Sequence, residues 1–351
     1  IEDLRRALKS EIEGKPDAAR IFRDFEDRFG AGVLLIYTEF DYYKVRDGKE
    51  GRKKTVSGWG SGFFVTTDGH IVTNKHVIQP WKFDQDVATM SGLGEIRIDE
   101  DSLRIACWES GTKALDGEEH PRTCLGYNNF ELHNLRVFAT AADHMQDHTI
   151  DTGVFGPRFK VHDLDNNDLA ILKAEGSGFH ALPCAGQRQA RTLQKLDAVM
   201  ALGYPRGQNG LETATVETSP SLGTVRKVEN TIHVTASIIP GNSGGPLIGP
   251  DGEVVGIVTR IYSETLGICI KIEHALALIA AGERARQVIT AFPALLHSGL
   301  PGWIIRKLSG LAPPCAFPFR GAAKRRHALS PGRPAPLRRC PGNQAPIRQA
   351  P

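Results

Sequence analysis

Most hydrophobic positions of this chain fall in short runs, and Gly, Pro and Asp-Gly pairs separate one run from the next. Many short runs rich in β-branched and aromatic residues, with turn residues between them, predict an all-β fold. A polar segment at 186–192 divides these runs into two groups. The first group predicts strands at 32–37, 60–66, 70–74, 94–98, 134–140 and 168–174. The second predicts strands at 198–203, 211–217, 222–228, 231–237, 246–249, 253–259 and 265–271.

Three segments have helical rather than strand-like spacing. Residues 2–13 and 16–29 predict short N-terminal helices, and 274–288, rich in Ala and Leu, predicts a closing helix. The second N-terminal helix carries an apolar stripe that we expect to pack on the body of the protein. The stripe consists of Ile21, Phe22, Phe25 and Phe29.

Two further segments interrupt the strand pattern. Residues 44–54 are charged and contain glycine, and they predict a loop. The polar stretch 80–133 predicts a surface elaboration of the first half, because long polar insertions usually lie on the surface.

Charge is distributed unevenly, which matters more than the net value of +3. Glu283 is the last acidic residue, so residues 1–283 carry a net charge of −9 and the remainder +12. Residues 312–351 contain nine prolines with much Arg, Ala and Gly, a composition that cannot bury a core and predicts disorder. This tail is either a basic segment that binds anionic surfaces or an out-of-frame extension. The acidic remainder gives no reason to expect nucleic-acid binding.

Six cysteines are present, at positions 107, 124, 184, 269, 315 and 340, and none forms a CxxC pair or a Cys/His cluster with zinc-ligand spacing. We therefore expect neither a metal nor another cofactor. Cys107 and Cys124 bracket one segment, and they could form a local disulfide or remain two reduced thiols. The sequence leaves both alternatives open.

The candidate chemistry centres on residues 240–246, Pro-Gly-Asn-Ser-Gly-Gly-Pro. A serine between glycines can be presented by a tight turn whose backbone N–H groups converge on one point. Ser243 is the candidate nucleophile, and the amides of Gly241 and Ser243 are the candidate oxyanion hole.

A serine hydroxyl needs a histidine to accept its proton and a carboxylate to orient that histidine. His76 follows a predicted β-hairpin and is the candidate base. Asp168 precedes an apolar strand, which favours it as the orienting acid over the nearby Asp163 and Asp165.

These three stretches, in the order His, Asp, Ser, resemble the trypsin-like serine proteases. The motifs GSGFFVTTDGHIVTNKHV, NDLAILK and IIPGNSGGPL are similar to those of the HtrA/DegP branch, and the resemblance covers about 55–275. It implies two six-stranded antiparallel barrels with the site between them. No segment resembles the PDZ domain that often follows in relatives. The expected divisions are 1–54 for the N-terminal helices and first strand, 55–275 for the protease domain with its first barrel to about 186 and its second at 187–275, 276–311 for the closing helix and linker, and 312–351 for the tail.

The resemblance also implies a function and partners. It implies a serine endopeptidase that hydrolyses polypeptides, unfolded ones included, in protein quality control, located in the periplasm or cell envelope. The N-terminal segment of relatives helps to assemble trimers, so homo-oligomerisation is the alternative role of the stripe on 16–29. The chain begins at Ile1 rather than Met, which predicts that a leader is missing.

Substrate preference follows from positions matched to the family. Ser237 would form the base of the primary pocket, and Thr259, Arg260 and Ile261 its wall. A neutral hydroxyl does not stabilise a buried lysine or arginine, and Ile261 would make the pocket shallow. We therefore expect cleavage after small aliphatic residues. A catalytically silent chaperone or binding module is the alternative function. An α/β-hydrolase would need the histidine after the serine, so the order excludes it.

Overall fold

The protein is described by a computed structural model. It forms two compact units, residues 1–287 and 288–351. Both sheets and the candidate site belong to the first unit, and the last helix begins in the first unit and ends in the second. The structure describes residues 17–113, 121, 123–126, 134–142, 145–149, 158–162, 168–186, 192–210, 215–263 and 266–296. The predicted helix at 2–13 and the tail at 312–351 lie outside these residues.

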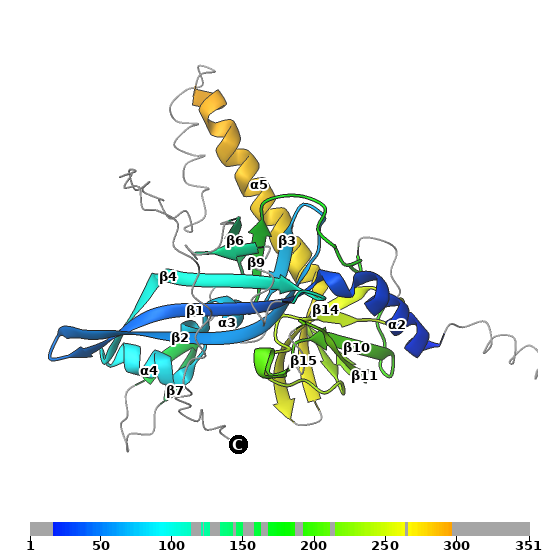
Figure 1. Cartoon of the computed structure of the whole chain (residues 1–351), viewed down its shortest axis with the longest axis horizontal. Coiled ribbons are helices and arrows are strands. Elements are labelled where there is room, and N and C mark those ends of the chain that lie inside the picture. Colours follow the sequence, from blue (N-terminus) through cyan, green and yellow to red (C-terminus); the bar gives the residue numbers. More distant parts are fainter. Residues whose placement is uncertain are drawn as a thin grey trace, which may run out of the picture. The chain divides into compact units, whose positions relative to one another are not determined.

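The first sheet has seven antiparallel strands in the order β5-β4-β1-β2-β3-β9-β6. It thus has one strand more than the six expected. Its long strands β1, β2 and β4 lie side by side in Figure 1. The strands are β1 (Val33–Arg46), β2 (Lys49–Phe64), β3 (His70–Thr73), β4 (Ile96–Glu109), β5 (Thr123–Leu125), β6 (Leu135–Thr140) and β9 (Ala170–Ala174).

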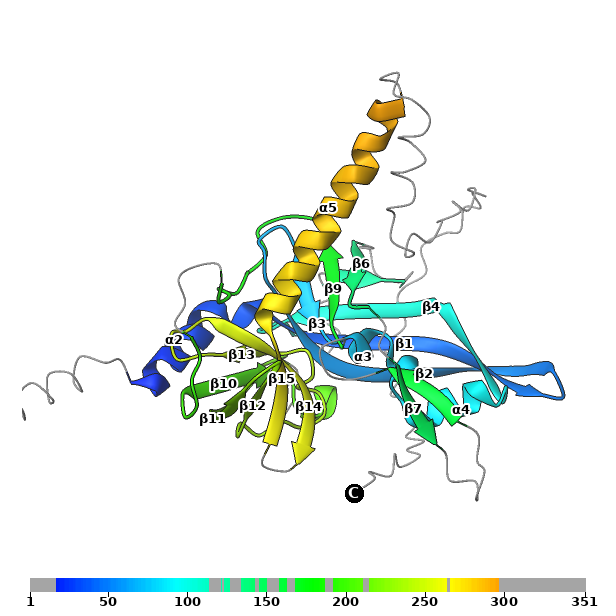
Figure 2. The same cartoon turned by 180° about the vertical axis from the view of Figure 1, so that it is seen from behind.

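The second sheet is a closed barrel of six strands in the order β10-β11-β12-β15-β14-β13 (Figure 2). With the first sheet it confirms the predicted all-β class of two successive barrel-like halves. The strands are β10 (Ala198–Gly203), β11 (Ser219–Val228), β12 (Thr231–Val234), β13 (Pro246–Ile248), β14 (Val254–Ser263) and β15 (Leu266–Lys271). A separate pair consists of β7 (Met145–Thr149) and β8 (Arg158–His162).

The described helices are few beside the strands. They are α2 (Ala18–Phe29), α3 (Lys75–Ile78), α4 (Gln85–Gly92) and α5 (Ile272–Leu296), with 3-10 turns η1 (Gly30–Gly32), η2 (Pro80–Lys82) and η3 (Gly207–Gly210). Helix α2 begins after Asp17, whose carboxylate accepts a hydrogen bond from the Ala19 N–H. Its stripe buries Phe22 and Phe25 in the core of the same chain, as expected for packing on the body.

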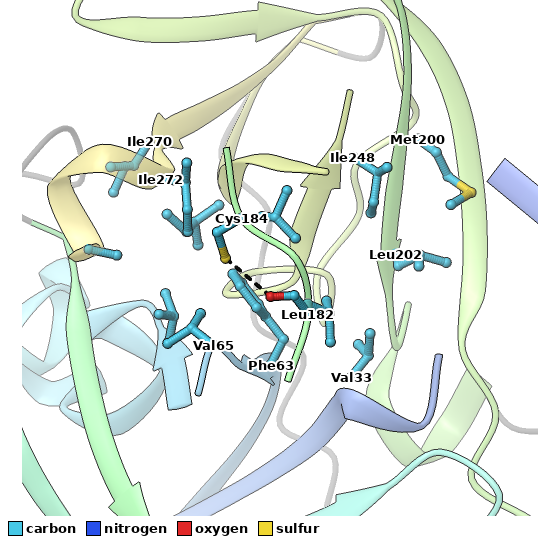
Figure 3. Close-up of a cluster of buried hydrophobic side chains, with 14 of the residues drawn as sticks. Val33, Phe63, Val65, Leu182, Cys184, Met200, Leu202, Ile248, Ile270 and Ile272 are labelled. Carbon is cyan, nitrogen blue, oxygen red and sulfur yellow. Dashed lines mark hydrogen bonds between the residues drawn. The ribbon is translucent and has the colours of Figure 1, made fainter. Parts of the chain in front are cut away.

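A shared core joins the two sheets, and Figure 3 shows its members pointing toward one another. Each fully buried aliphatic or aromatic side chain of this kind contributes about 1.5–3 kcal/mol to folding. The core therefore fixes the two sheets against each other, and the residues that approach from both sheets can form one site. Its labelled members are Val33, Phe63 and Val65 of the first sheet or its adjoining turn, Leu182 and Cys184 of the connection, Met200, Leu202, Ile248 and Ile270 of the second barrel, and Ile272 of α5.

The predicted loop at 44–54 is wrong, because these residues continue β1 and β2 as one long hairpin. The turn lies at Asp47-Gly48, where both residues have positive φ, 50° and 71°. An Asp-Gly pair favours this kind of two-residue turn. The many charged residues mask the strand pattern around this turn, and they are tolerated because this end of β2 is exposed.

The predicted surface elaboration at 80–133 is also wrong in part. Strand β4 extends the short predicted strand at 94–98 through Glu109 and pairs with β1, with Cys107 opposite Ile36. A register shift in this pairing between Glu39 and Asp41 changes the phase of the apolar alternation, so the sequence pattern looks irregular.

The predicted strand at 211–217 is wrong at its C-terminal end, which is the part of it that the structure describes. Within the described part of this segment, residues 215–217 are not in a strand, and β11 begins only at Ser219.

Strand β5 settles the alternatives for Cys107 and Cys124. Cys124 lies opposite Ala106 and Cys107 opposite Thr123, so the two cysteines are one register position apart. Neighbouring positions in a strand place side chains on opposite faces of the sheet. Neither cysteine is in a disulfide bond.

A buried ion-pair network holds β1, β2 and β4 together. Asp41 on β1 is 3% exposed and accepts hydrogen bonds from Arg104 Nη2 at 3.1 Å, Lys53 Nζ at 3.0 Å and Thr55 Oγ1 at 2.7 Å. The Arg104 guanidinium, above all, holds the pKa of the Asp41 carboxyl well below its usual range.

Candidate active site

His76 lies on the short helix α3, immediately after β3. Its Nδ1 is 2.6 Å from Asp168 Oδ2, and its backbone N–H donates to Asp168 Oδ1 at 2.8 Å. The same carboxylate therefore holds both the ring and the backbone of His76. A ring held at Nδ1 presents Nε2 on its other side, which is the arrangement a general base needs.

Asp168 is fully buried just before β9. Burial raises the pKa of its carboxyl, and the adjacent His76 acts in the opposite direction. A buried carboxylate is costly unless it is paired and hydrogen-bonded, and His76 supplies both kinds of contact. The rival candidates Asp163 and Asp165 lie outside the described residues.

Ser243 lies in the turn that precedes β13. Gly241 and Gly244 have φ of 103° and 88°, as the glycine pattern of this turn predicts. The Ser243 hydroxyl donates to the Thr259 carbonyl at 3.2 Å. Among the described residues it makes no hydrogen bond with His76. The structure thus brings His76 and Asp168 into contact, and Ser243 is connected to them through Thr259.

Asn74 makes that connection, and the sequence reasoning missed it. Its side-chain amide donates to the Asp168 carbonyl at 2.9 Å and to Thr259 Oγ1 at 3.2 Å. Asn74 belongs to the first sheet's side of the site and Thr259 to β14 of the second barrel. The signal in the sequence was an amide residue directly after a buried strand, two positions before His76.

The backbone N–H groups of Gly241 and Ser243 have no acceptor among the described residues. The peptide groups that carry them are nevertheless held in place. The Pro240 carbonyl accepts from the Arg206 N–H at 2.7 Å, and the Asn242 carbonyl accepts from the Gly245 N–H at 3.0 Å. Two oriented N–H groups without acceptors are available for a ligand oxygen.

The four predicted pocket residues differ in exposure. Ser237 is exposed, although the prediction placed it at the base of an enclosed pocket. Thr259 is buried, Arg260 is half-buried and Ile261 is 43% exposed. Thr259 and Ile261 lie on the strand that receives the Ser243 hydrogen bond. The pocket itself stays a prediction.

Within the described ranges, no group of three or more His, Cys, Asp or Glu residues could hold a metal ion. In the same ranges, no helix has the length and hydropathy that crossing a membrane requires.

Comparison with known families defines the class of protein to which the chain belongs. Residues 60–257 match the model of the trypsin-like peptidase domain, which is more than half of the chain. The chain belongs to this family.

Its relatives within the family are HtrA and DegP proteins. HhoA of Synechocystis sp. is 38% identical over 241 residues, which are 66% of this chain and 45% of HhoA. Mitochondrial serine protease HTRA2 of Drosophila pseudoobscura pseudoobscura is 24% identical over 281 residues, 77% of this chain and 51% of HTRA2. A periplasmic serine endoprotease DegP-like protein of Chlamydia pneumoniae is 25% identical over 232 residues, 66% of this chain and 34% of that protein.

The chain spans about half the length, or less, of these curated relatives. Among solved structures, a serine endoprotease from Yersinia pestis matches with a TM-score of 0.41 and 20% identity, over 75% of this chain and 66% of that one.

Proposed function

We propose that the protein is a serine endopeptidase that hydrolyses peptide bonds of polypeptide substrates through an acyl-enzyme. The observation that carries the proposal is the double contact of Asp168 with the ring and backbone of His76. A glycine-framed serine is connected to this pair through Thr259 and Asn74. Membership of the trypsin-like peptidase family and the named serine proteases among its relatives support it.

In the proposed reaction Ser243 Oγ attacks the scissile carbonyl and His76 accepts its proton. Asp168 stabilises the imidazolium, and His76 then donates the proton to the leaving amine. The Gly241 and Ser243 N–H groups bind the oxyanion. Water hydrolyses the acyl-enzyme by the same steps. The Ser243 hydroxyl must first turn from the Thr259 carbonyl toward His76, and this rotation breaks one hydrogen bond.

The first prediction concerns the nucleophile. Ser243→Ala should abolish both casein cleavage and labelling by a fluorophosphonate probe, because it removes the attacking oxygen. Asp168→Asn should lower kcat by about 10⁴-fold, since the amide favours the wrong histidine tautomer. Unchanged melting temperatures for Ser243→Ala would show that the fold is kept. Full casein cleavage by Ser243→Ala would contradict the mechanism.

The second prediction concerns specificity. We expect cleavage after small aliphatic residues, because Ile261 on β14 would limit the depth of the pocket and Ser237 offers no charge. Each fitted methylene is worth about 1–3 kcal/mol of discrimination. A peptide library should show preferred cleavage after Val or Ala, and Ile261→Gly should admit larger residues. Preferred cleavage after Lys, Arg or Phe would contradict the pocket assignment.

The relatives motivate two broader proposals, namely a role in protein quality control and a periplasmic or cell-envelope location. One relative is named as periplasmic and another as mitochondrial, so fractionation of cells of the source organism is the direct test. A separate proposal is assembly into a homotrimer, which light scattering would measure. The α2 stripe supports packing within one chain, because Phe22 and Phe25 are already buried there.

A further inference from the structure

Ser61 on β2 is a fully buried residue of the first sheet that contacts the nucleophile turn of the second barrel. Its hydroxyl donates to the Gly241 carbonyl at 2.7 Å, and its backbone N–H donates to the Ser243 carbonyl at 2.8 Å. One residue therefore holds the carbonyl groups on both sides of Asn242-Ser243. None of the roles assigned above uses it.

The Ser61 hydroxyl also holds the neighbouring turn. It accepts a hydrogen bond from the Tyr204 N–H at 3.0 Å. Two residues later, the Arg206 N–H donates to the Pro240 carbonyl, whose peptide group carries the Gly241 N–H. Ser61 thus fixes the nucleophile turn directly and, through Tyr204, the turn that orients its first peptide group.

The space around the hydroxyl is closed. A Cβ on Gly203 would lie 2.9 Å from Ser61 Oγ, and a Cβ on Gly244 would lie 2.1 Å from the Ser61 carbonyl. A side chain at either position would displace Ser61. The two glycines therefore leave room for Ser61 to reach the turn.

We propose that Ser61 is a positioning residue for the oxyanion hole, acting through the Gly241 carbonyl. Gly241 has positive φ and no Cβ to restrict it, so its flanking peptide groups can rotate unless they are held. Without the Ser61 hydroxyl, the Gly241 carbonyl and the Tyr204 N–H lose the contacts described above, and the turn can relax. The proposal rests on the proposed function.

The test compares Ser61→Ala with a matched control, Ser102→Ala. The Ser102 hydroxyl likewise accepts from a backbone N–H, that of Asp41 at 2.7 Å, and donates to a carbonyl, that of Asp99. It lies in β4 and has no part in the site. Both variants lose the same kind of hydrogen bonds, and only Ser61 contacts the turn.

We expect Ser61→Ala to lower kcat by at least about tenfold with KM within about twofold, since loss of one oxyanion donor costs about 10²–10³ in kcat. Affinity for a peptide boronate inhibitor should fall in parallel. Ser61→Cys, with a similar shape and a weak donor, should be intermediate. If the alanine variant does not fold, the cysteine variant provides the test instead. Ser102→Ala should keep wild-type kcat. Equal kcat values for the Ser61 variants and the control would overturn the proposal.

Hydrogen exchange gives a readout that does not depend on activity. The Asn242 N–H belongs to the same peptide group as the Gly241 carbonyl and donates to the Ile239 carbonyl at 3.1 Å. Its exchange should become faster in Ser61→Ala and Ser61→Cys and stay unchanged in Ser102→Ala. Unchanged exchange in the Ser61 variants would overturn the positioning role. A wild-type protein without hydrolysis or fluorophosphonate labelling would contradict the proposed function, and the exchange measurement would still decide the role of Ser61.

Discussion

Gly241 is the residue on which the geometry of the candidate site depends most directly. Its φ of 103° is unfavourable for any residue with a Cβ, and a Cβ there would lie 2.2 Å from the Tyr204 carbonyl oxygen. Neither the backbone conformation nor the surrounding space accepts a larger side chain. The turn would have to move, and its N–H groups would move with it.

The third prediction follows for Gly241→Ala. We expect kcat to fall by at least about 10²-fold, the effect of losing one oxyanion donor. Fluorophosphonate labelling should slow but remain detectable, because Ser243, His76 and Asp168 are intact. Rates of labelling and of peptide hydrolysis measure this. Gly58→Ala is a suitable control, since Gly58 on β2 has no positive φ and a Cβ there would meet no atom within 4 Å. Wild-type kinetics in Gly241→Ala would contradict the oxyanion assignment.

For single residues, the sequence predicted the positions at which the chemistry and the backbone conformation both require a particular residue type. The glycines around Ser243 predicted positive φ, and the structure has it at Gly241 and Gly244. The strand after Asp168 favoured that residue, which contacts His76. Ser61 and Asn74 could not be found in the same way. Their roles depend on partners about 180 residues away in sequence, as for Ser61 and Gly241, and no local pattern reports such partners.

Among the elements, the paired strands β1, β2 and β4 depend on the buried Asp41. Its carboxylate contacts Arg104, Lys53 and Thr55, so it connects three strands. Its pKa is depressed in the folded protein, and the unfolded value is about 3.9. The charged form therefore contributes stability above pH 3.9, and that contribution is lost as the pH falls below it.

The fourth prediction is that Asp41→Asn lowers the free energy of unfolding by about 3 kcal/mol at pH 7, the lower end for breaking a buried pair. The difference in free energy of unfolding between wild type and Asp41→Asn should narrow by about 1 kcal/mol as the pH falls from 5 to 3. The reason is that unfolded wild-type protein binds a proton at Asp41 in that range. Urea unfolding at each pH measures both values. Asp99→Asn is a control in the same sheet. A difference that stays constant or widens toward pH 3 would contradict the assignment.

The elements also show where sequence patterns are insufficient. Strands of the closed barrel were largely predicted because each is a short apolar run between turn residues. The β1–β2 hairpin and β4 were missed or shortened. Their outer parts carry charged side chains on exposed faces, and the bulge opposite Asp41 breaks the alternation. Pairing with β1 stabilises these strands, and a pattern confined to one segment does not contain that information.

For the whole molecule, the fifth prediction concerns residues 312–351, which lie outside the described part of the chain. Their composition, with nine prolines and no acidic residue, predicts that they bury no core. A chain ending at residue 311 should therefore keep the melting temperature and the peptidase activity of the full chain. Differential scanning calorimetry and a peptide assay measure these. A markedly lower melting temperature would show that the tail packs on the body.

The contact between Ser61 and the nucleophile turn has a consequence during synthesis. Ser61 and Gly241 are 180 residues apart, and the shared core likewise needs both sheets. Such non-local contacts form late, because the intervening chain must be ordered first. A nascent chain that has not yet reached Ser243 contains His76 and Asp168 but lacks the nucleophile. Under the proposed mechanism such a chain cannot cut peptide bonds, and activity cannot appear before the nucleophile turn of the second barrel has been translated.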